Sequence, residues 1–160
     1  MEHRRVSFML ITAGVLALLG GAALFLVYAP VTANECSQAY PELAFLFWPG
    51  LIYLWIIGLF YCAAMFEYFR ICVRIRSDRS FCKENALGLN HIALFMCAAG
   101  LLWVLLPLLL TMVYRFNIGP SFIVFMLAAM ASFALGLLAW ALGRLLARAV
   151  MLKEENDLTV

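Results

Sequence analysis

Charged residues are scarce in this chain. Asp, Glu, Lys and Arg make up 12% of its 160 residues, while hydrophobic residues make up 67%. A soluble domain has about 25% charged and about 45–50% apolar residues. Because so few polar side chains are available to face water, the composition excludes a water-soluble globular protein and predicts a protein surrounded by lipid.

The chain also lacks the residue patterns of catalysis and of ion transport. Its long apolar runs contain no Asp, Glu, Lys, Arg or His near their middles, and proton relays and voltage sensors need such groups. The five cysteines form no C-x-x-C pair and no Cys/His cluster with metal-binding spacing. There is no glycine-rich phosphate loop. We therefore predict that the protein is not an enzyme and holds no metal or cofactor.

Four apolar runs fill most of the sequence, at residues 6–28, 43–69, 91–114 and 120–142. Each is long enough to cross a bilayer, which takes about 20 residues in a helix. A lipid-exposed backbone must satisfy its own hydrogen bonds, so these spans should be helices. We predict an all-α membrane protein of one domain, residues 1–160, with four transmembrane helices in an antiparallel bundle.

The basic residues lie on one side of these spans. Ten of the 11 Lys and Arg residues lie before the first run, between the second and third runs, or after the fourth. Only Arg115 lies elsewhere, between the third and fourth runs. Basic connections stay in the cytoplasm, so both termini and the middle loop are predicted to be cytoplasmic. This face should attract anionic lipid headgroups. The same bias is common in membrane proteins, and no direct binding of nucleic acid is predicted from it.

The connections differ in character. Residues 29–42, which include Pro30 and Pro41, read as an irregular outer loop. Residues 70–90 read as the cytoplasmic loop, into which the second helix continues as far as Arg76. Residues 143–160 read as a cytoplasmic tail that continues the fourth helix to about Glu154 and ends in a short acidic segment.

Small residues form a stripe on the first helix, where Ala13, Ala17 and Gly21 are spaced four apart. Such a stripe lets a second backbone approach closely. Packing within the chain is the main interpretation, and formation of a homo-oligomer is the alternative.

Two ionisable residues mark the cytoplasmic edge of the spans. Glu67 precedes Arg70 by three residues, a spacing that favours an ion pair on one helix. His91 opens the third span at the same depth. It could pair with Glu67 across the bundle or respond to pH. We take Glu67 and His91 as a candidate interfacial polar pair.

Two stretches on the cytoplasmic side are distinctive. The first, Ser80-Phe81-Cys82-Lys83-Glu84-Asn85, follows the basic extension of the second helix, and we expect Phe81 to fold back against the bundle. The second is the terminus, Leu152-Lys153-Glu154-Glu155-Asn156-Asp157-Leu158-Thr159-Val160. With four spans, these stretches resemble the YoaS-like family of small bacterial membrane proteins of unknown function. The resemblance covers essentially the whole chain and implies a bacterial cytoplasmic (inner) membrane location. It also implies a neighbouring gene for a short helix-turn-helix transcriptional regulator.

A regulatory or interaction protein is the leading functional hypothesis, because both stretches lie on the cytoplasmic face. The tail could add a strand to a partner's sheet or lie in a groove. A transporter or exporter subunit for small molecules, or a lipid-binding structural protein, is the alternative. The residues that we predict to bind a soluble partner, such as a helix-turn-helix regulator, are Arg70, Arg74, Arg76, Phe81, Glu84, Asn85, Glu155, Asn156, Asp157, Leu158 and Thr159.

Overall fold

The structure, a computed structural model, describes residues 2–77, 81–112, 119 and 121–158; the side chains of residues 2–7, 39, 42, 43, 154 and 156–158 lie outside that description. In chain order the elements are α1 (Glu2–Ala23), the π turn η1 (Leu24–Tyr28), α2 (Ala29–Ala39), the 3-10 helix η2 (Pro41–Leu46), α3 (Phe47–Arg76), α4 (Lys83–Met112) and α5 (Ser121–Leu158).

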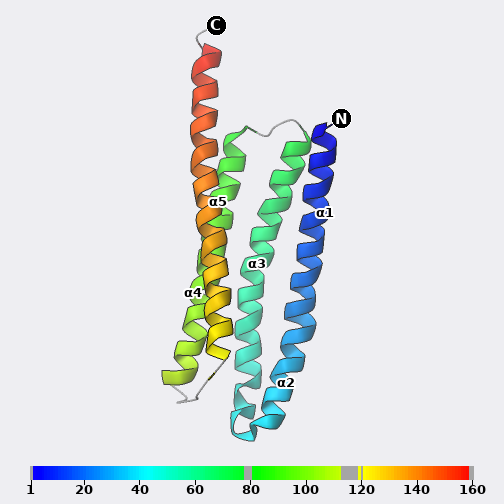
Figure 1. The fold of residues 1–160 in the computed structure, drawn as a ribbon, viewed down its shortest axis with the longest axis vertical. Coiled ribbons are helices and arrows are strands. Elements are labelled where there is room, and N and C mark those ends of the chain that lie inside the picture. Colours follow the sequence, from blue (N-terminus) through cyan, green and yellow to red (C-terminus); the bar gives the residue numbers. More distant parts are fainter. Residues whose placement is uncertain (1, 78–80, 113–118, 120, 159–160) are drawn as a thin grey trace.

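Four long helices run antiparallel to their chain neighbours (Figure 1). Each contains a segment long and apolar enough to cross a membrane, at Phe8–Gln38, Ala44–Arg76, Lys83–Met112 and Ser121–Lys153. The predicted all-α fold with four spanning helices is therefore confirmed. The start of α1, the turn between α3 and α4, and the end of α5 lie at one end of the molecule, which we call the basic end (Figure 1).

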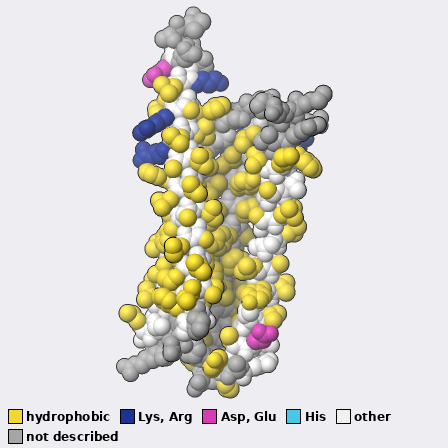
Figure 2. All heavy atoms as spheres, in the orientation of Figure 1, with side chains coloured by type: hydrophobic (Ala, Val, Ile, Leu, Met, Phe, Trp, Pro, Cys, Tyr) yellow, Lys and Arg dark blue, Asp and Glu magenta, His cyan; other side chains and the backbone are white. Residues whose placement is uncertain are grey.

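The helices form an open row. The backbone of α1 approaches only α3 among the other long helices, α3 also neighbours α4, and α4 neighbours α5 in the described part of the chain. Helix α3 thus lies between α1 and α4, and α4 lies between α3 and α5, with the closest packing between α4 and α5. The visible face of the row is mostly hydrophobic (Figure 2), and large hydrophobic side chains are exposed on all four long helices, as lipid contact requires.

The predicted irregular loop at residues 29–42 is wrong. The first helix turns through η1 and continues as α2 to Ala39. Pro30 lies in the first turn of α2, where a missing N–H costs little. The Ala29 N–H donates to the Leu24 carbonyl five residues back, and this wider turn accommodates the proline ring within one long helix.

The π turn leaves the Phe25 carbonyl without a helical partner. In a π register that carbonyl would accept from residue 30, which is a proline and has no N–H. The indole Nε1 of Trp55 on α3 donates to it instead, at 3.1 Å. The break in the first helix is therefore stabilised from the neighbouring helix.

At the basic end, the predicted continuation of the second helix to Arg76 is confirmed, since α3 ends there. The third helix begins earlier than predicted, because α4 starts at Lys83 and not at His91. Polar residues at the start of α4 suggested a loop, yet Asn85 is only 1% exposed and its Oδ1 accepts from Arg74 of α3. The fourth helix, predicted to continue to about Glu154, runs on to Leu158. A terminus that adds a strand to a partner's sheet does not fit this helix.

Small residues bring α4 and α5 together. The buried Ala86, Ala93, Gly100 and Pro107 follow one another at intervals of seven along α4. They face buried small residues spaced three or four apart on α5, namely Ala129, Ser132, Gly136, Ala139 and Gly143. Seven-residue spacing is that of helices in a left-handed supercoil, and small side chains allow close approach in lipid.

The α1 helix packs differently. Its Gly14 lies under the rings of Tyr68 and Phe69 of α3, and the Tyr68 hydroxyl donates to the Leu10 carbonyl at 2.9 Å. The stripe of Ala13, Ala17 and Gly21 does not take part: both alanines are exposed, and a methyl group on Gly21 would meet no atom within 4 Å. Packing of this stripe within the chain, the main interpretation from sequence, is therefore wrong.

Candidate functional site

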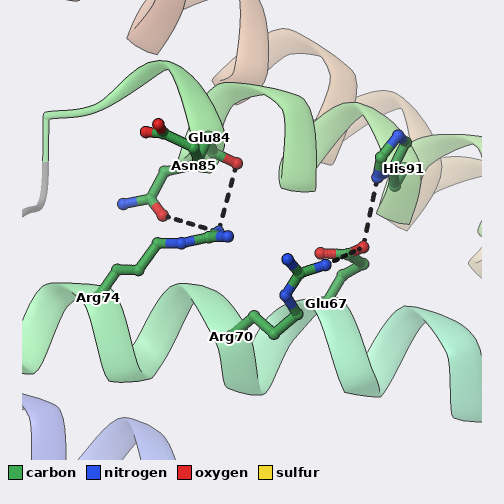
Figure 3. Close-up of polar contacts among 6 residues, drawn as sticks. All are labelled: Glu67, Arg70, Arg74, Glu84, Asn85 and His91. Carbon is green, nitrogen blue, oxygen red and sulfur yellow. Dashed lines mark hydrogen bonds and ion pairs between the residues drawn. The ribbon is translucent and has the colours of Figure 1, made fainter.

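Polar side chains of α3 and α4 meet near the basic end. We call this group, shown in Figure 3, the polar cluster; its members are Glu67, Arg70, Arg74, Glu84, Asn85 and His91. Residues 67, 70 and 74 are three or four apart and so lie along one side of α3. The cluster therefore includes residues from the first three turns of α4.

The Glu67 carboxylate lies at the centre of the cluster and is buried. Its Oε1 accepts from Arg70 Nη1 at 3.2 Å and lies 3.3 Å from His91 Nδ1 (Figure 3). The structure thus brings together the two residues of the candidate interfacial pair. A buried carboxylate is tolerated only when partners compensate its lost hydration, and here one partner comes from each helix.

A glycine on α4 makes room for this carboxylate. A methyl group on Gly88 would lie 3.2 Å from Ile71 Cδ1 and 3.5 Å from Glu67 Oε2. The missing side chain lets α3 approach at the level of Glu67. The spacing of Gly88 and His91, one turn apart on α4, then places the imidazole over the same carboxylate.

Arg74 forms the second contact between the helices. Its Nη1 donates to the Glu84 carbonyl and to Asn85 Oδ1, both at 3.4 Å (Figure 3). These bonds hold the first turn of α4 against α3 and account for the burial of a polar side chain there. Glu84 also lies in that first turn, where its negative charge complements the helix dipole.

The rim of the cluster is open to solvent. The side chains of Arg70 and His91 remain 49% and 53% exposed while they contact Glu67. A guanidinium carries N–H donors of the kind that suit carboxylate and phosphate oxygens. Within the described residues, no three His, Cys, Asp or Glu side chains are grouped so that they could hold a metal ion.

The other predicted partner-binding residues lie apart from the cluster. Arg76 ends α3 and is exposed, and Phe81 is 61% exposed. The expectation that Phe81 folds back against the bundle is therefore wrong. Glu155 is exposed on α5. Of the remaining four, Asn156, Asp157 and Leu158 continue the helix with side chains outside the described part, and Thr159 lies outside it entirely.

The end of α5 extends past the rest of the molecule (Figure 1). Among the side chains of α5 that the structure describes, Val150 is the last that is buried. Beyond it, residues 151–158, which we call the projecting segment, add about 12 Å of helix at 1.5 Å per residue. Met151 and Leu152 are 53% and 66% exposed there.

Sequence reasoning missed a set of hydrogen bonds midway along the helices, which we call the central hydrogen-bond chain. Trp103 Nε1 on α4 donates to the Tyr61 hydroxyl on α3 at 3.2 Å. That hydroxyl lies 2.6 Å from Ser132 Oγ on α5, which in turn donates to the Ala128 carbonyl. A lone serine with two distant aromatic donors gives no signal in a linear pattern.

Comparison with known proteins identifies the family. The model of the family described as "Protein of unknown function (DUF2975)" matches residues 31–160.

The chain belongs to the DUF2975 family.

It is also similar to the "Uncharacterized membrane protein YoaS" of Bacillus subtilis (strain 168), with 26% identity over 157 residues that cover 98% of this chain and 94% of that protein. No solved structure matches the chain significantly. The match supports the resemblance seen in the sequence and the assignment as a membrane protein. The matched region of the family model begins in α2 and includes the polar cluster and the projecting segment.

Proposed function

We propose that this membrane protein binds a soluble cytoplasmic protein at its basic end and holds that protein at the membrane. The observation that carries the proposal is the projecting segment, a helix that continues beyond every neighbour it could pack against. Its exposed Met151 and Leu152 would face water at this height. Exposed apolar side chains on a helix are what a groove on a partner binds.

Basic side chains lie along α5, both before this segment and within it. Lys and Arg side chains are seen along α5 near the basic end, whereas the rest of the visible face is mostly hydrophobic (Figure 2). They come from Arg144, Arg148 and Lys153, all exposed. The first two lie where the helix would leave the membrane and suit anionic headgroups. The residues beyond Arg148 would then lie in the cytoplasm, on the side from which a soluble partner approaches.

A helix-turn-helix regulator is the partner that we propose. The stretches around Phe81 and the terminus carry the resemblance to the YoaS-like family, which implies such a regulator gene nearby. Tethering it at the membrane would keep it from its DNA sites. The protein itself then needs no catalytic group and no direct contact with nucleic acid.

Affinity capture from native membranes after mild crosslinking tests the proposal, with the regulator co-expressed. The full chain should capture the regulator, and a chain lacking Lys153–Val160 should lose it. Leu152→Ser, which keeps the length, should weaken capture, whereas Gln38→Ala at the opposite end should not. Equal capture by the full and shortened chains contradicts this role for the tail. If both the full and the shortened chain capture only lipid and further copies of the protein itself, transport or lipid binding is favoured instead.

A further inference from the structure

The α5 helix meets α3 through very little of its length. No Cα atom of α5 comes within 8 Å of a Cα atom of α3 in the described part of the chain. The hydrogen bond between Tyr61 and Ser132, at 2.6 Å, spans this gap. It is the one hydrogen bond between α3 and α5 among the described residues. The position of α5 relative to α3 therefore depends on α4 and on this bond.

The direction of the bond follows from its neighbours. The Ser132 hydroxyl donates its proton to the Ala128 carbonyl, at 2.7 Å. Tyr61 must then be the donor to Ser132 Oγ, which leaves the tyrosine oxygen free to accept from Trp103 Nε1. Every hydroxyl and N–H in this chain of bonds has a partner, and the chain joins three helices.

The burial of Ser132 favours the arrangement of α3 and α5 in which this bond is formed. Ser132 is 1% exposed and lies among apolar residues, about 16 Å along α5 from Ser121 at 1.5 Å per residue. Near the middle of a bilayer, no water can replace Tyr61 as a donor. A tilt of α5 away from α3 would leave the tyrosine hydroxyl without its acceptor.

Close packing makes α4 and α5 move together. A methyl group on Gly136 would lie 2.9 Å from Cys97 Sγ, and one on Gly143 would lie 3.2 Å from the Ala86 carbonyl oxygen. The α4–α5 pair can therefore pivot against α3 as a unit. The projecting segment lies far from this contact, so a small change in angle at Ser132 gives a larger displacement beyond Val150.

We propose that the Tyr61–Ser132 hydrogen bond fixes the angle between α3 and the α4–α5 pair, and so sets where the projecting segment stands. The geometric part of the proposal stands alone. Its consequence for a soluble partner rests on the proposed function. Opening of this bond would move the segment without any change in the residues that compose it.

Distance measurements between spin labels test the geometric part. Labels carried by bio-orthogonal residues at positions 76 and 151, both exposed, leave the natural cysteines in place. In the purified full chain in lipid nanodiscs, Tyr61→Phe should shift and broaden the distance distribution. Ser132→Ala should do the same, and the double variant should add nothing, because both changes remove one bond.

Tyr68→Phe is the matched control. It removes a tyrosine hydroxyl that donates to the Leu10 carbonyl at 2.9 Å, a contact between α3 and α1 that does not involve α4 or α5. Its distance distribution should equal that of the unaltered chain. The proposal is overturned if Tyr61→Phe and Ser132→Ala leave the distribution unchanged, or if Tyr68→Phe broadens it equally. Because no partner is present, this result is independent of capture of the regulator.

Discussion

Single polar residues in this protein are held by partners on other helices. Four side chains of α3 each donate a hydrogen bond to another helical segment, namely Tyr53, Trp55, Tyr61 and Tyr68. Three of the four acceptors are backbone carbonyls. Such bonds contribute about 0.6 kcal/mol each in membrane proteins, with a range up to about 2 kcal/mol. Together they fix the rotation of helices whose surfaces are otherwise uniformly apolar.

The Glu67 carboxylate is shared by the side chains of Arg70 and His91, and its replacement gives the first prediction. Glu67→Gln keeps the shape but removes the charge that Arg70 and His91 contact. Charged hydrogen bonds contribute about 1.5–3 kcal/mol, less where the partner is half-exposed. We expect a loss of about 1 kcal/mol in unfolding free energy, measured by denaturation in mixed micelles.

The control for this change is Glu35→Gln. Glu35 is exposed on α2, at the other end of the molecule. Its replacement should change stability by less than about 0.5 kcal/mol. Equal stability of the Glu67→Gln variant and the unaltered chain would show that the cluster does not hold α3 to α4.

At the scale of elements, the glycines of the long helices differ in how closely they are packed. Gly136 of α5 is closely packed, since an added methyl would lie 2.9 Å from Cys97 Sγ and 3.2 Å from the Ala93 carbonyl oxygen. The backbone oxygen cannot move aside. Gly136→Ala should therefore push α4 and α5 apart and cost about 1–3 kcal/mol, as measured by thermal unfolding in detergent.

Gly20→Ala on α1 is the control for the Gly136→Ala substitution. A methyl group there would meet no atom within 4 Å. Gly20→Ala should be neutral or stabilising by up to about 1 kcal/mol, because alanine favours a helix more than glycine. If both substitutions lower the melting temperature alike, close packing is not the reason for glycine at position 136.

The π turn gives a prediction about a single element. Trp55→Phe removes the donor to the Phe25 carbonyl and should cost about 1 kcal/mol. Pro30→Ala restores an N–H that can bond that carbonyl within the helix. In the Pro30→Ala background, Trp55→Phe should then cost measurably less in the same denaturation assay. An equal cost in both backgrounds would mean that the proline does not create the need for Trp55.

These elements also show what a sequence reveals of a membrane protein. The spans follow from apolar runs of about 20 residues, since lipid tolerates little else. The helical character of residues 29–39 was missed because Pro30 and its polar neighbours resemble a loop, and the first turn of α4 was missed because Asn85 is buried only by other helices. The Tyr61–Ser132 contact depends on helix rotation. A helix that is apolar all round has no stripe to reveal which face points inward.

At the scale of the whole molecule, the beginning of α1 and the end of α5 lie at the same end of the bundle (Figure 1). An even number of spans requires both termini on one side of the membrane. Ten basic residues belong to the connections and termini of that side, and we therefore propose that this side is cytoplasmic. The projecting segment and the polar cluster would then face the cytoplasm, as the proposed partner requires.

Natural cysteines test this orientation without a fusion protein. Cys36 is exposed on α2 at the end opposite the basic end, and Cys82 is partly exposed beside α4's first turn. A membrane-impermeant maleimide should label intact cells at Cys36, and Cys36→Ser should abolish that labelling. Cys82 should react only after the cells are permeabilised. Cys62, although exposed, lies midway along α3 and should be shielded by lipid in both cases. Labelling of Cys82 in intact cells would reverse the orientation and place the projecting segment outside, where no cytoplasmic regulator could bind it.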